Sequence, residues 1–314
     1  MKKKAIVGGS ILLFIALSSI YLLIPSDIHV SQIQNLPVPP GALIRCFNNS
    51  GKMKDWWPRN TMIAETTATY NGYSFKFSKF NITEVQKVII YDNNNDSLNS
   101  SVSVTLSGRD SSFLYWNCDL KTTLSPVNRI RQYLKAIEIK KAITKILGAF
   151  SAYTANTTNI YGISIRRGKV TDSVLISEKK ELPVYPGVPE IYSSINSLKQ
   201  YIVQQRANQV DSPICNITPK VNGGFALIVA IPINKTIKEN EIKKIKTLMY
   251  NGNQLITEVK GGDYTINKAL KSLDNYISDY QLTPAVLPYL SLLTDREKVT
   301  DSSKWITKIC YPIY

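Results

Sequence analysis

The sequence predicts an α+β protein in which two domains follow one N-terminal transmembrane helix. Three observations lead to this class: a stretch of uncharged residues near the start, short alternating apolar runs that lead into a long amphipathic helix, and a strand–helix–strand–strand order that occurs twice near the end. The expected boundaries are 1–26 for the anchor, 27–157 for the first domain and 160–314 for the second. With 44% hydrophobic residues in 314, both domains have material for a packed core.

The N-terminal segment has the pattern of a membrane anchor. Lysines occupy positions 2–4, and residues 5–24 carry no charge. As a helix this stretch would be roughly 30 Å long, the thickness of a bilayer core. Because lysines stay on the cytoplasmic side, we expect a single-pass protein of the cell membrane with the bulk of the chain extracytoplasmic. A cleaved signal peptide, whose apolar core normally has about 7–15 residues, is the alternative.

Charge and residue counts exclude several functions. The net charge of +15 is spread evenly, with +6 in residues 27–150 and +6 in residues 151–314, so no nucleic-acid partner is expected. One histidine, His29, leaves almost nothing for a His-based triad or a zinc site, and we expect no metal and no cofactor. The four cysteines are expected to be small buried hydrophobes, with their disulfide state left open: Cys46, Cys118, Cys215 and Cys310.

Residues 27–150 predict one sheet and one long helix. A strand at 29–33 is followed by a helix with apolar residues at 42, 43, 46 and 47, which should end before Trp56. Asn71-Gly72 is typical of a two-residue hairpin, and further strands are expected at 85–91, 101–106 and 112–120. Apolar residues from Ile139 to Phe150 have helical spacing, with the lysines at 140, 141 and 145 turned away. Such a sheet, curled around one helix, leaves a space that can hold an apolar ligand.

This element order resembles the SRPBCC superfamily of START-like, polyketide cyclase and lipid-transport proteins. The likeness rests on an anchor that runs into a strand and on Trp56-Trp57-Pro58 after the first helix. It implies a helix-grip fold. Trp56, Trp57 and Trp116 are the candidates for its ligand cavity, because aromatic side chains give pockets a large contact area. Two adjacent tryptophans on a loop should not both face one core, so one could lie at the cavity mouth. Plain core packing is the competing interpretation.

Residues 160–314 contain an internal repeat. Residues 195–202 align with 270–277, and residues 226–233 align with 306–313, at offsets of 75 and 80. The copies, 165–233 and 250–314, each predict strand, helix, strand, strand: at 170–177, 188–204, 214–218 and 225–233 in the first, and at 254–260, 264–280, 286–293 and 305–313 in the second. Two such units should pair about a pseudo-two-fold axis and enclose a cleft.

The duplicated order resembles the GyrI-like domain, the effector-binding domain of AraC- and MerR-type regulators. The closing run at 301–313 and Gly261-Gly262-Asp263-Tyr264 before the second helix carry the likeness. It implies a cleft for drug-like, often cationic or aromatic, molecules. Some members of that family use a Glu on the penultimate strand, but residues 286–293 contain no carboxylate here. The regulators also carry a helix-turn-helix segment where this chain has its apolar segment, so transcriptional control is not implied.

The candidate ligand-binding residues of the second domain are one acid and four aromatic side chains. Glu258 is the nearest carboxylate to the missing one, with a solvated strand residue as the competing interpretation. The aromatic candidates, for each of which core packing competes, are Tyr250, Tyr264, Tyr289 and Trp305.

We therefore expect a membrane-anchored protein that binds small hydrophobic or cationic and aromatic molecules and has no catalytic residues. One alternative is a hydrolase of reactive ring compounds that uses Glu258 and Tyr289. A second is an interaction protein whose clefts are vestigial. The basic residues from Arg129 to Lys145 are expected to form a solvated helix face, with anionic lipid head groups as the alternative partner. The oligomeric state is left open.

Overall fold

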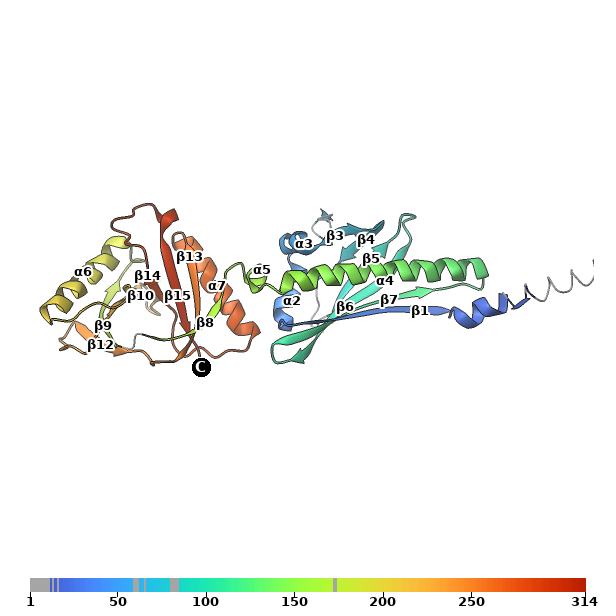
Figure 1. The fold of residues 1–314 in the computed structure, drawn as a ribbon. Coiled ribbons are helices and arrows are strands. Elements are labelled where there is room, and N and C mark those ends of the chain that lie inside the picture. The colour runs from blue at the N-terminus through green and yellow to red at the C-terminus, as the bar shows by residue number, and fades with distance from the viewer. Residues whose placement is uncertain are drawn as a thin grey trace, which may run out of the picture. The chain divides into compact units, whose positions relative to one another are not determined.

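The computed structural model describes residues 12, 14–15, 17–58, 62–64, 66–79, 85–171 and 174–314 (Figure 1). The chain divides into two compact units, Met1–Asn156 and Thr157–Tyr314. The described residues form two antiparallel sheets together with helices, which confirms the α+β class.

The predicted membrane anchor, residues 5–24, falls largely outside the described residues. Its described end, residues 17–23, is helical. Within the part of the chain that the structure describes, no helix combines the length and the apolar character needed to cross a bilayer, so the predicted transmembrane helix has no support here.

A seven-stranded antiparallel sheet forms the body of the first unit, in the order β1-β7-β6-β5-β4-β3-β2. At the β3–β4 turn, Asn71 and Gly72 have φ values of 52° and 81°, as the predicted two-residue hairpin requires. The strands are β1 (Asp27–Leu36), β2 (Met62–Ala64), β3 (Thr67–Tyr70), β4 (Tyr73–Phe77), β5 (Val85–Tyr91), β6 (Ser97–Gly108) and β7 (Ser111–Lys121).

The first unit also contains two short helices, α2 (Pro40–Asn48) and α3 (Ser50–Trp56), and the long helix α4 (Pro126–Thr154). Helix α4 begins at a capping residue, Ser125, whose hydroxyl accepts a hydrogen bond from the Asn128 backbone, and Pro126 supplies the fixed φ of a first turn. Its apolar face is buried from Ile139 to Phe150, and Lys140, which lies between, is exposed, as the spacing predicts. The helix packs on β1 and β7.

Aromatic rings fill the core of the first unit, which corrects one prediction. Trp56 and Trp57 are 3% and 1% exposed, and their ring centroids lie 5.6 Å apart. Trp56 ends α3, whereas Trp57 has extended backbone (φ −65°, ψ 131°), so the chain turns between them and both rings reach one core. The expectation that an adjacent pair could not share a core was wrong.

The predicted ligand space of the first unit is occupied by these and neighbouring rings. Trp116 is fully buried against Phe75 at 5.8 Å, and its indole N–H donates to Ser100 Oγ at 3.2 Å. Phe150 of α4 lies 4.7 Å from the Trp56 ring. The structure therefore places all three tryptophans in the packed core and not at the mouth of a cavity.

The second unit contains one eight-stranded antiparallel sheet in the order β12-β9-β11-β10-β14-β15-β13-β8. Its helices are α5 (Thr157–Tyr161), α6 (Val188–Gln204) and α7 (Asp263–Asp279), with a 3₁₀ turn, η2, at Ser302–Lys304. Its strands are β8 (Arg166–Lys169), β9 (Val174–Leu182), β10 (Ile214–Pro219), β11 (Phe225–Pro232), β12 (Lys243–Thr247), β13 (Asn253–Lys260), β14 (Tyr289–Leu292) and β15 (Ile306–Pro312).

The sheet order shows the duplication that the sequence repeat predicts. The copies β9-α6-β10-β11 and β13-α7-β14-β15 meet at the β10–β14 pair in the middle of the sheet, where Ile214 opposes Ser291 and Cys215 opposes Leu290. The two halves are therefore equivalent in topology about the centre of the sheet.

Two edge strands were not predicted. Strands β8 and β12 lie at the two ends of the sheet and are rich in lysine and arginine, so their sequences have the composition of solvated loops. Lysines on edge strands discourage pairing with another sheet. The first strand of the repeat, expected at 170–177, begins at Val174.

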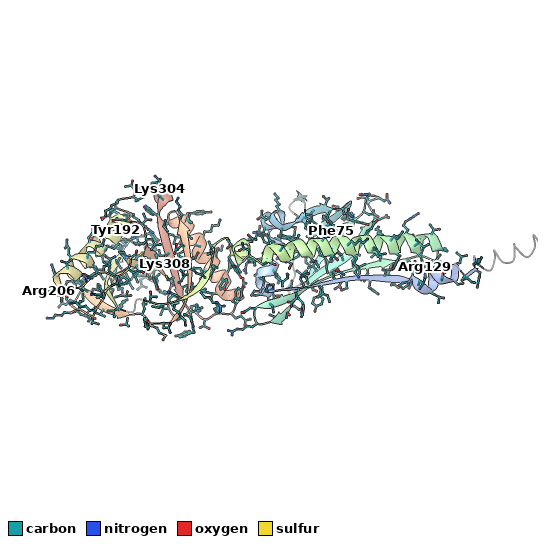
Figure 2. All side chains as sticks on the ribbon, in the orientation of Figure 1. Phe75, Arg129, Tyr192, Arg206, Lys304 and Lys308 are labelled. Carbon is teal, nitrogen blue, oxygen red and sulfur yellow. The ribbon has the colours of Figure 1, made fainter. Side chains whose placement is uncertain are left out.

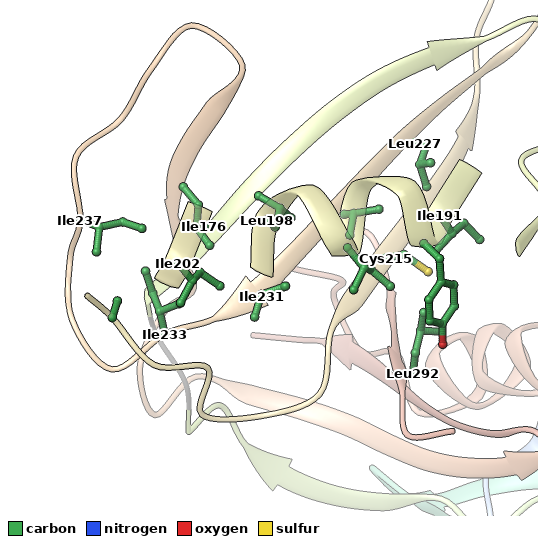
Figure 3. Close-up of a cluster of buried hydrophobic side chains, with 14 residues drawn as sticks. Ile176, Ile191, Leu198, Ile202, Cys215, Leu227, Ile231, Ile233, Ile237 and Leu292 are labelled. Carbon is green, nitrogen blue, oxygen red and sulfur yellow. The ribbon is translucent and has the colours of Figure 1, made fainter. Parts of the chain in front are cut away.

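One face of the second sheet is covered by helices. Side chains of helix α6 pack against strand β11 in one buried cluster: Ile191, Leu198 and Ile202 come from α6, and Leu227 and Ile231 come from β11 (Figure 3). All four cysteines of the chain are buried, as expected for small apolar residues.

Candidate functional site

The face of the second sheet turned away from α6 carries a cleft. Side chains alternate between the two faces of a strand. On β11, Leu227 and Val229 belong to the core under α6, whereas Ile228 and Ala230 line the cleft. The cleft therefore uses the set of strand residues that the helices do not bury.

The cleft has two adjoining compartments, of about 250 Å³ and about 460 Å³. Leu175, Ile214, Leu248 and Tyr289 line both of them, so the compartments share one wall. We call the smaller one, which reaches Ser291 and Lys308, the polar compartment, and the larger one, which reaches Ile228 and Leu287, the apolar compartment. The larger volume lies within the range of small-molecule sites, roughly 300–1,000 Å³.

A hydrogen-bonded chain forms one wall of the polar compartment. The Tyr289 hydroxyl donates to Gln254 Oε1 at 3.1 Å, and Gln254 Nε2 donates to the Lys169 carbonyl at 2.9 Å. Burial raises the pKa of the neighbouring Cys310 thiol, although a hydrogen bond with Tyr289 acts in the opposite direction. Cys310 is therefore a neutral thiol near pH 7 and a poor nucleophile.

Ser291 carries an unused hydrogen-bonding group into the polar compartment. The residue is 2% exposed, and among the described residues its Oγ has no hydrogen-bond partner. Ser291 on β14 lies directly opposite Lys308 on β15 and opposite Ile214 on β10. A buried hydroxyl without a partner costs about 1–3 kcal/mol, so this position is suited to receive a polar group of a ligand.

Positive charge predominates in the polar compartment. Arg166, Lys169 and Lys308 line it, against one lining carboxylate, Asp211, among the described residues (Figure 2 labels Lys308). Lys308 Nζ lies 3.3 Å from Asp211 Oδ2, and 23% of the Lys308 side chain is exposed. Lys169 Nζ donates to the neutral Asn253 side chain at 2.7 Å.

The apolar compartment is lined mainly by hydrophobic side chains. Ile214, Ile228, Val286 and Leu287 line it, and the described residues supply no carboxylate to its wall. Val286 and Leu287 of this lining are 54% and 61% exposed. Of the described lining residues, Lys246 is the charged one.

The two halves of the repeat supply these different walls. Ile214 pairs with Ala230 in the first half, and Tyr289 pairs with Cys310 in the second, so Tyr289 stands at the position of Ile214. At the offset of 80 residues Lys308 stands at the position of Ile228. One backbone arrangement thus carries apolar side chains in one copy and polar side chains in the other.

Of the residues predicted for this cleft, Tyr289 lines it. Tyr250 and Tyr264 are 70% and 83% exposed, in a turn before β13 and at the start of α7. The Trp305 indole N–H donates to the Val299 carbonyl at 2.6 Å, and its ring stacks on the Arg296 guanidinium at 4.6 Å.

Glu258 lies beyond the lining of the cleft. Its Oε1 is 3.7 Å from Arg166 Nη2, and 51% of its side chain is exposed. The carboxylate is thus a solvated partner of a cation, as the competing interpretation of this residue held.

Sequence reasoning missed most of the polar wall: Asp211, Gln254, Ser291 and Lys308. Three of them lie on strands that were predicted, and the side chains of a strand alternate between its two faces, so strand periodicity could have grouped the residues of each face. The sequence did not show which of the two sheet faces carries the cleft. Asp211 lies in the loop between α6 and β10, where no periodicity applies.

Neither a protein-family model nor a curated protein matches this chain. Among solved structures, the EcmrR C-terminal domain is similar at 14% identity and a TM-score of 0.39, covering 48% of this chain and 98% of that one. A hydrolase from Listeria innocua has 10% identity and a TM-score of 0.38, covering 48% and 92%. The di-domain ARO/CYC BexL from the BE-7585A biosynthetic pathway has 7% identity and a TM-score of 0.35, covering 91% and 85%. Likenesses this weak carry no argument about function.

Proposed function

We propose that the second unit binds a small amphipathic molecule in the cleft of its sheet, as an effector-binding module of the GyrI-like type would. The observation that carries the proposal is the pair of adjoining compartments, one apolar and one polar, with the Ser291 hydroxyl, which no described residue satisfies, in the polar one. A ligand with one apolar and one polar end is complementary to both walls at once.

The chemistry of the cleft favours binding over catalysis. Cys310 is a protonated thiol, and Asp211 and Glu258 pair with Lys308 and Arg166. The hydrolase alternative needs Glu258 to act with Tyr289. These residues lie on β13 and β14 with β15 between them, so they are about 10 Å apart across the sheet, and they oppose β15 residues two positions apart along it. Glu258 is also engaged by Arg166.

For the first unit we propose a scaffolding role within a START-like arrangement of sheet and helix. The supporting observation is its core, in which Trp57, Phe75 and Trp116 are buried at 1% exposure or less. Rings packed at 5.5–5.8 Å fill the space between sheet and helix in which the resemblance implied a ligand.

We further propose that residues 5–24 tether the chain to the cell membrane, with both units on the extracytoplasmic side. The sequence of this segment supports the tether, and so do exposed apolar residues at its end, Leu22 and Leu23 at 86% and 78%, and near the start of α4, Leu124 and Val127 at 84% and 66%. Arg129 Nη1 donates to the Ile24 carbonyl at 2.8 Å and so ties this segment to the start of α4.

The tether is tested in two experiments. Sedimentation with membranes after carbonate washing tests whether the chain is membrane-bound, and protease digestion of intact cells tests on which side of the membrane the two units lie. Recovery of the chain in the soluble fraction would contradict the tether.

The binding proposal is tested by isothermal titration calorimetry of the full chain with 1-octanol. We expect one site, and we expect Leu287→Asp to weaken it at least about tenfold, because a carboxylate at the apolar wall must be desolvated by the ligand. Val203→Asp is the matched control, since Val203 is 74% exposed on α6 and outside the cleft lining. Absence of binding by octanol and by its charged analogues octanoate and octylammonium would refute the proposal.

A further inference from the structure

We propose that the ligand of this cleft carries an anionic head group, a carboxylate, sulfate or phosphate, that is held between Ser291 and Lys308. The alkyl or aryl part of the ligand would lie in the apolar compartment. This inference rests on the proposed binding function and narrows the class of ligand. The charge it gives the ligand is opposite to that of the cationic molecules expected from the sequence.

The first argument is the supply of hydrogen-bond donors. Ser291 and Lys308 are direct cross-strand neighbours on the cleft face, and such neighbours have Cβ atoms about 4.5–5.5 Å apart. The Ser291 hydroxyl has no hydrogen-bond partner within the part of the chain that the structure describes. The Lys308 ammonium has three N–H donors, of which the pair with Asp211 uses one. Together they offer two adjacent donors to one anionic oxygen group.

The second argument is charge. Among the described residues one carboxylate, Asp211, lines the polar compartment, and its pair with Lys308 is neutral as a unit and favours neither sign. Lys169, whose ammonium is bonded to a neutral amide, adds a positive charge that an anionic ligand can use. Hydrogen bonds between charged partners are about twice as strong as neutral ones, so this difference selects the sign of the head group.

The third argument is the direction in which polarity changes across the sheet. Lys308 opposes Ser291, Ser291 opposes Ile214, and Ile214 opposes Ala230, so one row of neighbours runs from a cation through a hydroxyl to apolar side chains. Three strand spacings make this row about 14 Å long. A head group at Ser291 therefore directs a tail of medium length towards β11 and the apolar compartment.

The test compares three ligands that share one tail and differ in head-group charge: octanoate, 1-octanol and octylammonium, each titrated into the full chain. We expect octanoate to bind at least about tenfold more tightly than octylammonium, with octanol between them. Raising the salt concentration should weaken octanoate binding and leave octanol binding unchanged, because salt screens the charge interaction.

Two substitutions with opposite expected effects locate the head group. Lys308→Met should weaken octanoate binding about tenfold and change octanol binding less than about threefold. Asp211→Asn should strengthen octanoate binding, because it removes the carboxylate that competes for the Lys308 ammonium. Lys199→Met, an equal change of charge on the exposed face of α6, is the control and should change neither.

The outcomes separate the two proposals. Tighter or equal binding of octylammonium by the unmodified chain would overturn the anionic head group while leaving small-molecule binding intact, and this result does not depend on the folding of any variant. A preference for octanoate that Lys308→Met leaves unchanged would overturn its placement. Absence of binding by all three ligands would overturn the binding function itself and the inference with it.

Discussion

Two buried serines of the second unit should respond oppositely to the same substitution. Ser291 and Ser177 are 2% and 3% exposed and lie on strands of one sheet. Ser177 Oγ donates to the Lys244 carbonyl at 2.9 Å, whereas Ser291 Oγ has no partner among the described residues. Replacement by alanine removes a hydrogen bond in one case and an unsatisfied hydroxyl in the other.

The magnitudes follow from that difference. Loss of a typical intramolecular hydrogen bond costs about 0.5–1.5 kcal/mol, so Ser177→Ala should lower the free energy of unfolding of the second unit by about 1 kcal/mol. Relief of a buried unsatisfied group is worth about 1–3 kcal/mol, so Ser291→Ala should raise that free energy by about 1 kcal/mol or more. For a unit of this size each kcal/mol moves Tm by roughly 2–4 °C.

Pulsed hydrogen–deuterium exchange across a urea series measures this, because mass spectrometry follows peptides of each unit separately. With saturating octanoate the advantage of Ser291→Ala should shrink or reverse, since the ligand then supplies the missing partner. Destabilisation of the ligand-free protein by Ser291→Ala as large as that by Ser177→Ala would refute the reasoning, because it would mean that the hydroxyl is already satisfied.

Three further predictions concern the first unit. Trp116→Phe should destabilise the first unit by about 1–3 kcal/mol, because the substitution removes the hydrogen bond to Ser100 and leaves a small cavity. A change below about 0.5 kcal/mol in the free energy of unfolding, measured by urea denaturation, would contradict this. Desolvation pushes the pKa of Asp92 up, but the Lys135 ammonium at 2.5 Å and two backbone N–H groups outweigh it and lower the pKa below its ordinary value. A carboxyl whose pKa is lower in the folded state stabilises that state at pH values above its unfolded pKa of about 3.9. This contribution is lost as the pH falls through the folded pKa. Asp92→Asn should therefore flatten the acid limb of a plot of Tm against pH below about 4, and an unchanged slope would count against the pair. Arg129→Ala should speed amide exchange in residues 21–26, because Arg129 holds the Ile24 carbonyl, whereas the exposed Arg131→Ala should not.

Local sequence signals determined most elements of the fold. The helix expected at 188–204 is Val188–Gln204, and the one expected at 264–280 is Asp263–Asp279. Each has apolar residues at helical spacing over several turns, and this signal depends on the segment alone. Asn71-Gly72 likewise encodes its own turn, because both residues tolerate the positive φ that the hairpin needs.

Segments whose structure depends on neighbours were missed or misjudged. Strand β12 contains Lys243, Lys244 and Lys246, and it is a strand because β9 lies beside it. The order of Trp56 and Trp57 could not show that a helix ends between them and turns both rings into one core. In both cases a long-range contact decides the outcome, and the local sequence does not contain it.

The sequence by itself determined that the second unit is a duplicated strand and helix pattern and that Tyr289 belongs to one of its strands. The composition of the cleft was decided by tertiary structure alone. The face that α6 and α7 cover sets which alternate residues on each strand are left for the cleft, and the sheet order brings Lys308, Ser291 and Ile214 into one row although Ile214 is distant in sequence. Cross-strand pairing creates this adjacency, and no pattern within a single segment records which residues it joins.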